Sequence, residues 1–526
     1  MIENEEDLIF KISAQSLSHD KKNCVIKILS AAQIREADQY TISHEPIKSI
    51  DLMERAAVRF TELFTAKFPG PIPIFIFSGY GNNGGDGLAI ARLLLQKNDQ
   101  VQVYILADEK HYSEDFLINQ TWLTTLSKHS VHEVVTDSDF PAITTGAIII
   151  DALFGSGLNK PLHGLAASLV SYLNLQDATR ISVDIPSGLF ADAVGNGITF
   201  KAHFTFTFHQ PKLAFLFPEN QDAVGAWEAV DIGLDRHFID AAASFRFLPG
   251  KEDILKIIHP RKKFDHKGTF GHAFIHAGSP GKMGASIMCA AACARSGAGL
   301  TTVFVPKNTS QILNTSIPEA MTEEYAPGKK IAADLSKYNA FAFGPGIGTD
   351  DAARAVFLSL LKRIEVPTVV DADALNIISR EKKGLKLLPE NSIITPHPKE
   401  FERLSGKTSN WLERHELQVG ISKKHHVYIV LKGAYTCIST PAGNCYFNPT
   451  GNPGMAKGGS GDVLTGIIAG LLAQHYSPEE ACLLGVYLHG LSADMAVRNK
   501  SVYSLLATDI ISNIGNAFSE ITGQSL

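Results

Sequence analysis

Short apolar runs alternate with helix-like stretches along most of this 526-residue chain. Neighbouring parallel strands need a crossover connection, usually a helix, whereas antiparallel strands need only a tight turn. The alternation therefore predicts an α/β fold with mostly parallel central sheets. The first series of strand-like runs is IPIFIFS (72–78), QVYIL (102–106), AIIID (147–151), RISVDIPSG (180–188) and HFTFTF (203–208).

A second series follows a break in the pattern. The alternation stops near Ile232, and residues 235–262 are charged and irregular, as in a linker. The second series is HAFIHAG (272–278), LTTVFVP (300–306), AFAFGPG (340–346), PTVVDAD (367–373), NSIITPH (391–397) and VYIVLKG (427–433). Because domains commonly hold about 150 residues or somewhat more, we expect an N-terminal extension over 1–27, a first domain over 28–240 and a second over 245–526.

Several helix signals agree with this division. Ser30 and Gln33 have capping-box spacing and predict a helix that begins after Ser30. The stretch 51–68 places Leu52, Ala56 and Phe60 on one face, and 87–96 is helix-like after a glycine-rich loop. The stretch DVLTGIIAGLLAQH (462–475) is apolar nearly all round, so we expect a buried helix.

Composition excludes several classes of protein. Hydrophobic residues make up 45% and charged residues 19%, which argues against disorder. The balance of 48 basic and 54 acidic residues, −6, disfavours binding to nucleic acid by the overall field. Six cysteines without a CxxC pair favour buried thiols over a disulfide framework or zinc motif. The acidic start MIENEEDLIF and apolar runs too short to span a bilayer predict a cytoplasmic protein with no membrane partner.

Three polar segments follow strands of the first series. They are SGYGNNGGDG (78–87), Asp151 in DALFGSG, and Asp184 and Ser187 in VDIPSG. Ligands of open α/β sheets bind at the carboxyl ends of strands, and glycines there permit positive φ and close approach of backbone to a ligand. A plain surface turn, or an Asp that serves only as a turn or cap residue, is the alternative at each position. Asn83, Asp151 and Ser187 offer only oxygen ligands, which suits a hard cation better than zinc or copper.

NNGGDG, DALFGSG and VDIPSG, in this order, resemble the NAD(P)H-hydrate epimerase family over about residues 28–235. The resemblance implies a Rossmann-like three-layer sandwich that interconverts the R and S forms of hydrated NAD(P)H at C6. It implies a K⁺ site at Asn83, Asp151 and Ser187, and Asp184 as a substrate contact and the acid/base group. A family lysine matches Lys212, whose role stays open. The residues implied to line the hydrate are Asn82, Asn83, Gly84, Gly85, Asp86, Gly155, Ser156, Gly157, Leu158, Asn159, Lys160 and Pro161.

The most informative motif of the second series is GMAKGGSGDVLTG. Gly458, Gly459 and Gly461 precede Asp462 where the buried helix is expected to begin. Backbone N–H groups at such an end stabilise a transferring phosphoryl group, and an Asp there can accept a hydroxyl proton. The alternative is an Asp that only caps the helix.

GGSGD resembles the anion-hole motif of the ribokinase-like superfamily. With HAGSPGKMGAS, FGPGIGTD, DADALN, TPHPKE and LKGAYT, it is similar to the ADP/ATP-dependent NAD(P)H-hydrate dehydratases over about residues 250–520. The resemblance implies Asp462 as the catalytic base and Mg²⁺ bound with ADP. Residues implied to bind the nucleotide are Lys432, Gly433, Ala434, Tyr435, Thr436 and Gly461. Residues implied to contact the hydrate are Ala285, Gly346, His397 and Asp462.

Some of these positions also have ordinary structural explanations. Asp371 and Asp373 suit either Mg²⁺ binding or a turn at a strand end. His397, between two prolines, is either a surface histidine or a site residue. Cys437 and Cys445 are expected in a β-hairpin without chemistry of their own.

Both halves indicate one metabolite, so the chain resembles the fused bifunctional NAD(P)H-hydrate repair enzymes. That family implies epimerisation by the first domain and ADP-dependent dehydration of the S form by the second, with release of AMP and phosphate. The expected partners are NAD(P)H hydrate and ADP or AMP, and the chain is expected to form a homo-oligomer. Two alternatives stay open: a sugar or vitamin kinase in the second half, and a non-catalytic nucleotide sensor.

Overall fold

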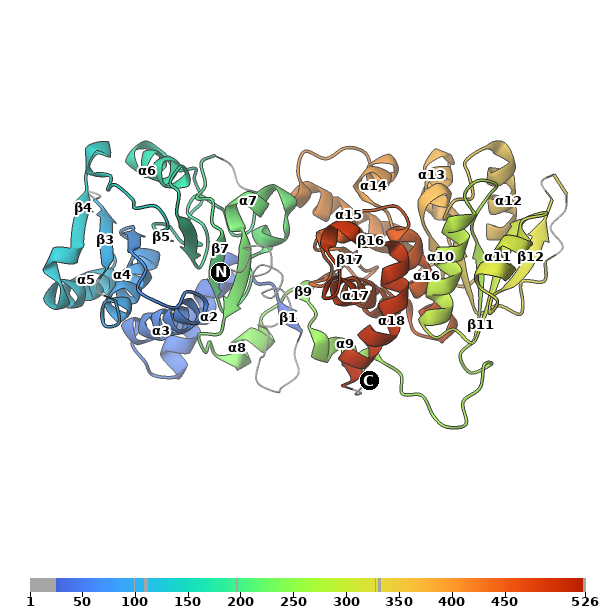
Figure 1. Cartoon of the computed structure of the whole chain (residues 1–526), viewed down its shortest axis with the longest axis horizontal. Coiled ribbons are helices and arrows are strands. Elements are labelled where there is room, and N and C mark those ends of the chain that lie inside the picture. Colours follow the sequence, from blue (N-terminus) through green and yellow to red (C-terminus); the bar gives the residue numbers. More distant parts are fainter. Residues whose placement is uncertain are drawn as a thin grey trace. The chain divides into compact units, whose positions relative to one another are not determined.

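The computed structural model describes residues 25–98, 100–107, 112–194, 197–326, 328–329 and 333–523. Within them the chain forms two compact units (Figure 1). One runs from Ile26 to Ser244 and includes Asn410–Leu412. The other holds Phe245–Ser409 and the chain from Glu413 onward. Of the expected extension over 1–27, residues 1–24 lie outside the described residues, and Ile26–Lys27 form the short strand β1.

A parallel seven-stranded sheet forms the centre of the first unit, in the order β4-β3-β2-β5-β6-β7-β8. Its strands are β2 (Ile74–Ser78), β3 (Val101–Leu106), β4 (Val131–Val134), β5 (Ile148–Ala152), β6 (Thr179–Val183), β7 (Phe204–Phe208) and β8 (Ala226–Val230). The predicted α/β class is therefore confirmed. The chain builds outward from β2 to β4 and then returns to β5. This places the switch point, where such sheets bind ligands, between β2 and β5.

Helices cover both faces of this sheet (Figure 1). Apolar residues of α3, α4 and α5 pack against one face in a common core with Ile74 and Ile76, and α6 packs against the other face over Phe75 and Phe77. The helices are α2 (Ala31–His44), α3 (Ser49–Lys67), α4 (Asn82–Leu95), α5 (Glu114–Leu126), α6 (Gly164–Asn174), α7 (Gln221–Val224) and α8 (Arg236–Ala241). The predicted capping box of Ser30 and Gln33 starts α2.

The glycine-rich segment after β2 differs from the expected loop. Helix α4 begins at Asn82, so all of NNGGDG forms its first turns. The expected positive φ is wrong here, since the left-handed glycines lie elsewhere among the described residues. Close approach is the reason for glycine: a Cβ on Gly84 would lie 2.0 Å from the Gly79 carbonyl oxygen, and one on Gly87 would lie 2.6 Å from the Ala152 Cβ.

The stretch 235–262 also differs from the expected irregular linker. It holds α8, the strand β9 (Arg246–Leu248) and α9 (Lys251–Ile257). Leu248 and Ile254 are fully buried. The charged residues that suggested a linker occupy exposed positions of these short elements, while their few apolar residues are buried in a core. Elements this short do not produce a recognisable periodicity of apolar residues in the sequence.

The second unit holds another mostly parallel sheet, with the order β9-β18-β17-β16-β15-β14-β13-β10-β11-β12. Only the pairs β16–β17 and β17–β18 are antiparallel among those of this order. The further strands are β10 (His272–His276), β11 (Leu300–Pro306), β12 (Met321–Tyr325), β13 (Ala340–Phe343), β14 (Thr368–Val370), β15 (Ile393–Ile394), β16 (Tyr428–Leu431), β17 (Cys437–Ser439) and β18 (Cys445–Phe447). The switch point lies between β10 and β13. Cys437 and Cys445 lie in the predicted hairpin.

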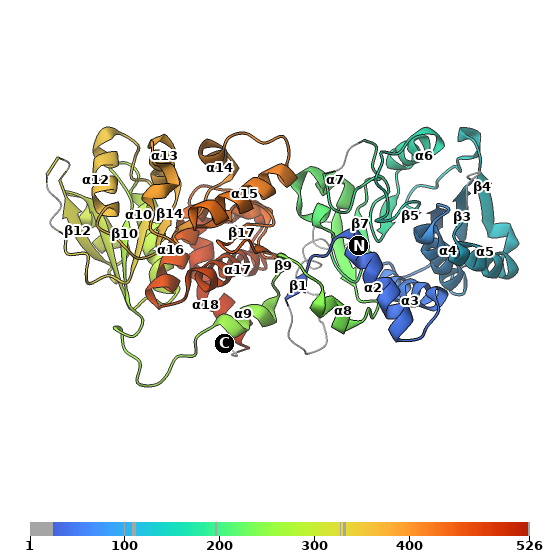
Figure 2. The ribbon, with the colours of Figure 1, turned by 180° about the vertical axis from the view of Figure 1, so that it is seen from behind.

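Four helices pack together over one face of this sheet. α10, α16, α17 and α18 share a core with Ala273 and Ala342, while α12 packs on the opposite face, where Phe357 meets Phe343 (Figure 2). The predicted buried helix is α16, and Cys289 and Cys293 of α10 are fully buried, as expected. The helices are α10 (Met283–Arg295), α11 (Ser310–Ser316), α12 (Asp351–Leu361), α13 (Ala372–Arg380), α14 (Pro398–Ser405), α15 (Trp411–His425), α16 (Ser460–Ala473), α17 (Pro478–Val497) and α18 (Ala507–Thr522). No helix of the described chain is both long and apolar enough to cross a membrane.

Candidate active sites

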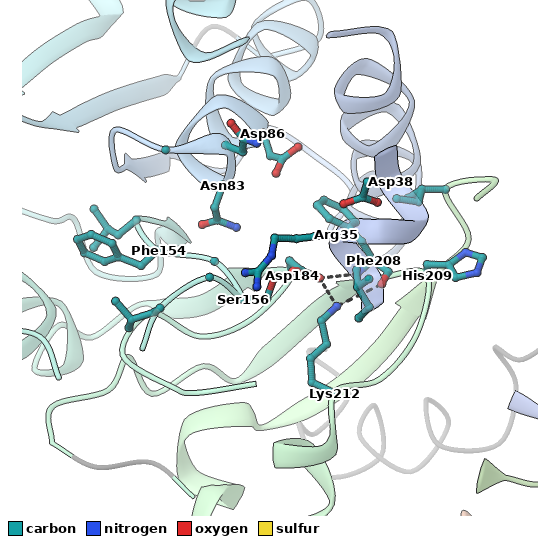
Figure 3. Close-up of a pocket in the computed structure, with 18 of the residues that line it drawn as sticks. Arg35, Asp38, Asn83, Asp86, Phe154, Ser156, Asp184, Phe208, His209 and Lys212 are labelled. Carbon is teal, nitrogen blue, oxygen red and sulfur yellow. Dashed lines mark hydrogen bonds and ion pairs between the residues drawn. The ribbon is translucent and has the colours of Figure 1, made fainter. Parts of the chain in front are cut away.

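A cavity of about 410 Å³ opens at the switch point of the first unit (Figure 3). Its wall combines residues from the ends of β2, β5 and β6 with residues of α2. The polar segments after the strands predicted the contribution of the three strand ends, but not that of α2. Of the predicted hydrate contacts, those in the wall are Asn82, Asn83, Asp86, Gly155, Ser156, Gly157, Leu158 and Asp184. Gly84 and Gly85 pack instead against Gly79 and Met53. Asn159, Lys160 and Pro161 lie outside the lining that the described residues form.

Of the predicted cation ligands, Asn83 belongs to this wall, whereas Asp151 and Ser187 are fully buried and lie outside the lining that the described residues form. Asp151 is fully buried at the end of β5, and its carboxylate accepts hydrogen bonds from the Ser187 Oγ (2.6 Å) and backbone N–H (2.8 Å). Burial raises the pKa of Asp151 to about 6, although the bonds from Ser187 act to lower it. Asn83 donates from Nδ2 to the Val183 carbonyl at 2.9 Å, and its buried Oδ1 has no hydrogen-bond partner among the described residues.

This donor set fits K⁺. An orphaned amide oxygen is costly to bury, and a bound cation would satisfy it. The same cation would offset the cost of burying the Asp151 carboxylate, and all three side chains offer oxygen. The fit of the site to K⁺ therefore rests on the unpaired Asn83 Oδ1 and the buried Asp151 carboxyl, in addition to the residue types.

Asp184 follows β6 and has a left-handed backbone, with φ 66°. A non-glycine residue in that region marks a strained position, of the kind that clusters at functional sites. Its Oδ1 accepts hydrogen bonds from the Lys212 Nζ (2.5 Å), the Phe208 N–H (2.9 Å) and the Thr207 Oγ1 (3.3 Å). Its Oδ2 makes no hydrogen bond within the described residues. One oxygen is thus fixed, and the other is available to a ligand.

The sequence left the role of Lys212 open, and the structure shows that this residue contacts Asp184. Its side chain is 1% exposed, and it pairs with Asp184 while donating to the Thr207 Oγ1 (2.8 Å) and the Phe208 carbonyl (3.2 Å). Lys212 is the buried cation that balances Asp184.

Sequence reasoning missed Asp38, which lines the same cavity from α2. Burial, followed by the charge of Asp184, raises the pKa of Asp38 to about 7, with Lys212 acting in the opposite direction. Burial and the neighbouring carboxylates, Asp184 first, also raise the pKa of Asp86 well above its ordinary range. In the sequence, Asp38 is marked only by its place on the expected helix beside Ala37 and Thr41, which are buried. Such a place does not distinguish a site residue from any other residue at the edge of a buried helix face.

The second candidate site lies at the start of α16. Gly459, with φ 94°, precedes the helix, and Asp462 is its third residue. Asp462 makes no hydrogen bond within the described chain, so the capping alternative finds no support. Burial, followed by the charge of Asp371, raises the pKa of Asp462 to about 6, while Lys432 acts to lower it. Raised in this way, a carboxylate remains ionised at neutral pH and becomes a stronger base.

Lys432 at the end of β16 points to this turn. A Cβ on Gly461 would lie 3.2 Å from the Lys432 Nζ. The Lys432 Nζ donates to the Asp371 Oδ1 at 3.0 Å, and the Asp371 Oδ2 accepts from the Thr465 Oγ1 at 2.8 Å. Each oxygen of Asp371 therefore accepts one hydrogen bond within the described residues. Asp373 is similarly bonded to the Gly348 N–H at 2.9 Å.

The other predicted site residues of the second unit comprise hydrate contacts and the nucleotide segment 432–436. Ala285 and Gly346 adjoin, since a Cβ on Gly346 would lie 3.0 Å from the Ala285 Cβ, and they mark the switch point between β10 and β13. His397 caps α14: its Nδ1 accepts from the Lys399 N–H at 3.1 Å and the Glu400 N–H at 3.4 Å. The other ring nitrogen of His397, Nε2, lies 3.4 Å from the Glu400 Oε1. The predicted nucleotide segment 432–436 forms a turn after β16, in which the Thr436 Oγ1 donates to the Gly433 carbonyl at 3.0 Å.

A buried cluster of His415, Cys437 and Cys445 lies apart from these features. Arg246 donates from Nε to the His415 Nε2 at 3.2 Å, so the neutral ring carries its proton on Nδ1. That Nδ1 faces the Cys437 Sγ at 3.7 Å. A metal would need the lone pair that this proton occupies. The cluster is therefore a hydrogen-bonded part of the core.

Comparison with known proteins identifies the family of both halves of the chain. The NAD(P)H-hydrate dehydratase family model matches residues 273–516, and the model for the YjeF-related protein N-terminus matches residues 49–214. The bifunctional NAD(P)H-hydrate repair enzyme of Moorella thermoacetica is 35% identical over 92% of this chain and 95% of its own length, and that of Coxiella burnetii is 33% identical over 92% and 97%.

A solved ADP/ATP-dependent NAD(P)H-hydrate dehydratase from Bacillus subtilis, co-crystallised with ATP and Mg²⁺, is 32% identical over 52% of this chain and 97% of that chain, with a TM-score of 0.47. The full-length relatives match both halves of the chain in one polypeptide. The chain therefore belongs to the family of bifunctional NAD(P)H-hydrate repair enzymes.

Proposed function

We propose that this chain returns hydrated NAD(P)H to NAD(P)H in two reactions, each performed by one unit. The first unit interconverts the R and S hydrates at C6, and the second dehydrates the S form with ADP, releasing AMP and phosphate. The observation that supports this best is the coexistence of a carboxylate-lined cavity in one unit with the Lys432–Asp462 arrangement at the start of a buried helix in the other. The domain limits are proposed as 28–240 and 245–526.

Dehydration needs a better leaving group than hydroxide. We assign Asp462 to take the proton of the C6 hydroxyl as that oxygen attacks the terminal phosphorus of ADP, with AMP leaving. Lys432 and the backbone N–H groups around Gly461 would stabilise the charge on the transferring phosphoryl group. Loss of phosphate from C6, with a proton leaving C5 and its C–H electrons forming the C5–C6 double bond, then restores the dihydronicotinamide. Mg²⁺ is proposed to accompany the nucleotide, and none of these steps is routed through it.

The remaining site assignments are also proposals. Asp184, through its free Oδ2, acts as acid/base on the hydrate, and K⁺ held by Asn83, Asp151 and Ser187 supplies positive charge beside the cavity. Ala285, Gly346 and His397 contact the hydrate in the second unit, and 432–436 holds the nucleotide. A cytoplasmic location is supported by the free cysteines Cys289, Cys293, Cys437, Cys445 and Cys482. The homo-oligomer stays a prediction.

One incubation tests the proposed function. Pure protein is given mixed R and S hydrate with ADP, with ATP, or without nucleotide, and absorbance of the dihydronicotinamide band is followed. We expect nucleotide-dependent return in two phases: a fast phase from the S form and a slower one as the R form epimerises. A stable phosphorylated product would instead indicate a kinase, and nucleotide binding without turnover a sensor.

Epimerisation is expected to depend on K⁺. The slow phase should weaken when choline replaces potassium, and potassium but not choline should raise the melting temperature of the first unit, since a ligand that binds only the folded state stabilises it. Ser187→Ala removes one oxygen ligand but keeps the backbone N–H that serves Asp151, and should raise the half-saturating potassium concentration by about 10–100-fold. Equal slow phases in potassium and choline would contradict the site.

A further inference from the structure

Asp38 is a cavity carboxyl that the proposed reactions do not yet use. We propose that Asp38 is the second proton-transfer group of the epimerase, giving its proton to N1 of the hydrated ring while Asp184 takes the proton of the C6 hydroxyl. This inference rests on the proposed epimerase function and adds a residue that the sequence motifs do not include.

The position of Asp38 suits this role. It projects from α2 into the cavity, across from the Asp184–Lys212 pair that follows β6 and β7 (Figure 3). Its carboxyl has no hydrogen-bond partner among the described residues, whereas Asp184 is fixed by three donors on Oδ1. The cavity therefore holds one anchored carboxylate, Asp184, and two carboxyl groups without a hydrogen bond among the described residues, Asp38 and Asp86, of which Asp38 comes from α2. The other ionisable residues that line the cavity with Asp38 are Arg35, Tyr80, Asp86, Asp184, His209 and Lys212.

The environment keeps Asp38 partly protonated at neutral pH. Burial, and then the negative charge of Asp184, raises the pKa of Asp38 to about 7, and Lys212 opposes this only in part. Asp184 faces the cation directly, at 2.5 Å. A carboxyl that retains its proton, opposite a carboxylate paired with a buried lysine, is a usual arrangement of an acid and a base in one site.

The chemistry of the substrate needs both groups. A hydroxyl on the carbon next to a ring nitrogen is a carbinolamine, whose configuration is lost when the carbon–nitrogen bond opens. As Asp184 accepts the hydroxyl proton, the O–H electrons form the C6 carbonyl. The C6–N1 electrons pass to N1, which takes the proton from Asp38. Rotation about C5–C6 and closure on the other carbonyl face, with both proton transfers reversed, gives the epimer and restores both carboxyl groups.

The full-length chain provides the test through its two kinetic phases. Asp38→Asn preserves shape but cannot transfer a proton, so we expect the slow phase to fall by about 10²–10⁴-fold toward the rate without protein. The fast, ADP-dependent phase should keep its rate. Glu36→Gln is the matched control, because Glu36 is exposed on the same helix and lies outside the cavity lining.

The pH profile separates a proton donor from a structural residue. Because a donor must hold its proton, the wild-type slow phase, corrected for the uncatalysed rate, should decline as pH rises through about 7. This decline should be absent from the residual rate of Asp38→Asn. The variant should also melt no lower than wild type at pH 8, since it removes a carboxylate whose ionisation opposes folding.

The outcomes distinguish the two levels of the proposal. A near wild-type slow phase in Asp38→Asn, or an equal loss at every pH with a lower melting temperature, would overturn the role of Asp38. Absence of a slow phase from the wild type, with a normal fast phase, would instead overturn the epimerase function itself.

Discussion

Asp462→Asn is expected to remove dehydration while leaving epimerisation intact. The amide keeps the size of the side chain but cannot accept the C6 hydroxyl proton, and loss of a general base typically costs about 10²–10⁴-fold in rate. Because burial raises the pKa of Asp462 to about 6 and the base must be ionised, wild-type dehydration should increase with pH through about 6 and then level off. The fast phase and its pH profile measure both effects.

Asp509→Asn is a matched control for that variant. Asp509 occupies the same third position of its helix, α18, and its Oδ2 accepts the Leu506 N–H at 3.0 Å. Its replacement keeps a capping oxygen but removes the charge that pairs with Lys500, so it should cost less than about 1 kcal/mol of stability and leave turnover unchanged. Asp462→Asn should show the reverse, with normal melting and lost turnover. Near wild-type dehydration in Asp462→Asn would move the base elsewhere.

Lys212→Met should destabilise the first unit strongly. Lys212 is fully buried and pairs with Asp184, whose side chain is only 14% exposed. Removing one partner of a buried pair leaves an uncompensated charge, which typically costs about 3–5 kcal/mol. We expect the first unit to melt roughly 10 °C lower and to lose epimerase activity. Lys201→Met, at an exposed position of the same unit, should have little effect.

A double variant identifies the cause of that loss. Asp184→Asn combined with Lys212→Met removes the orphaned charge, so much of the lost stability should return while epimerisation stays absent. The fast phase of dehydration, which belongs to the second unit, should persist in both variants below the melting temperature. A loss below about 1 kcal/mol in Lys212→Met would mean that the pair is solvated.

Local sequence patterns were sufficient for the fold class and much of both sites. Strand periodicity placed Asp151, Asp184 and Ser187 at the carboxyl ends of parallel strands, and those ends meet in any sheet of this type. The glycine-rich start of α16 could also be predicted from the sequence, because its glycines and the apolar run after them are adjacent in the chain. Period alone could not show that α4 begins at Asn82, since glycine is a weak helix former and tertiary packing against Gly79 and Ala152 decides the boundary.

The sequence by itself determined that two parallel α/β sheets form and which polar residues follow their strands, because hydrophobic period and turn residues are local properties. Only the tertiary structure decided which distant side chains complete the sites. Asp38 reaches the first cavity from a helix that precedes the sheet, and Lys212 reaches Asp184 from beyond β7. Asp371 holds Lys432 across 61 positions of chain. Such pairings depend on how distant segments of the chain come together and on how deeply the side chains are buried. Both determine which groups touch and which are ionised, and no local sequence pattern encodes them.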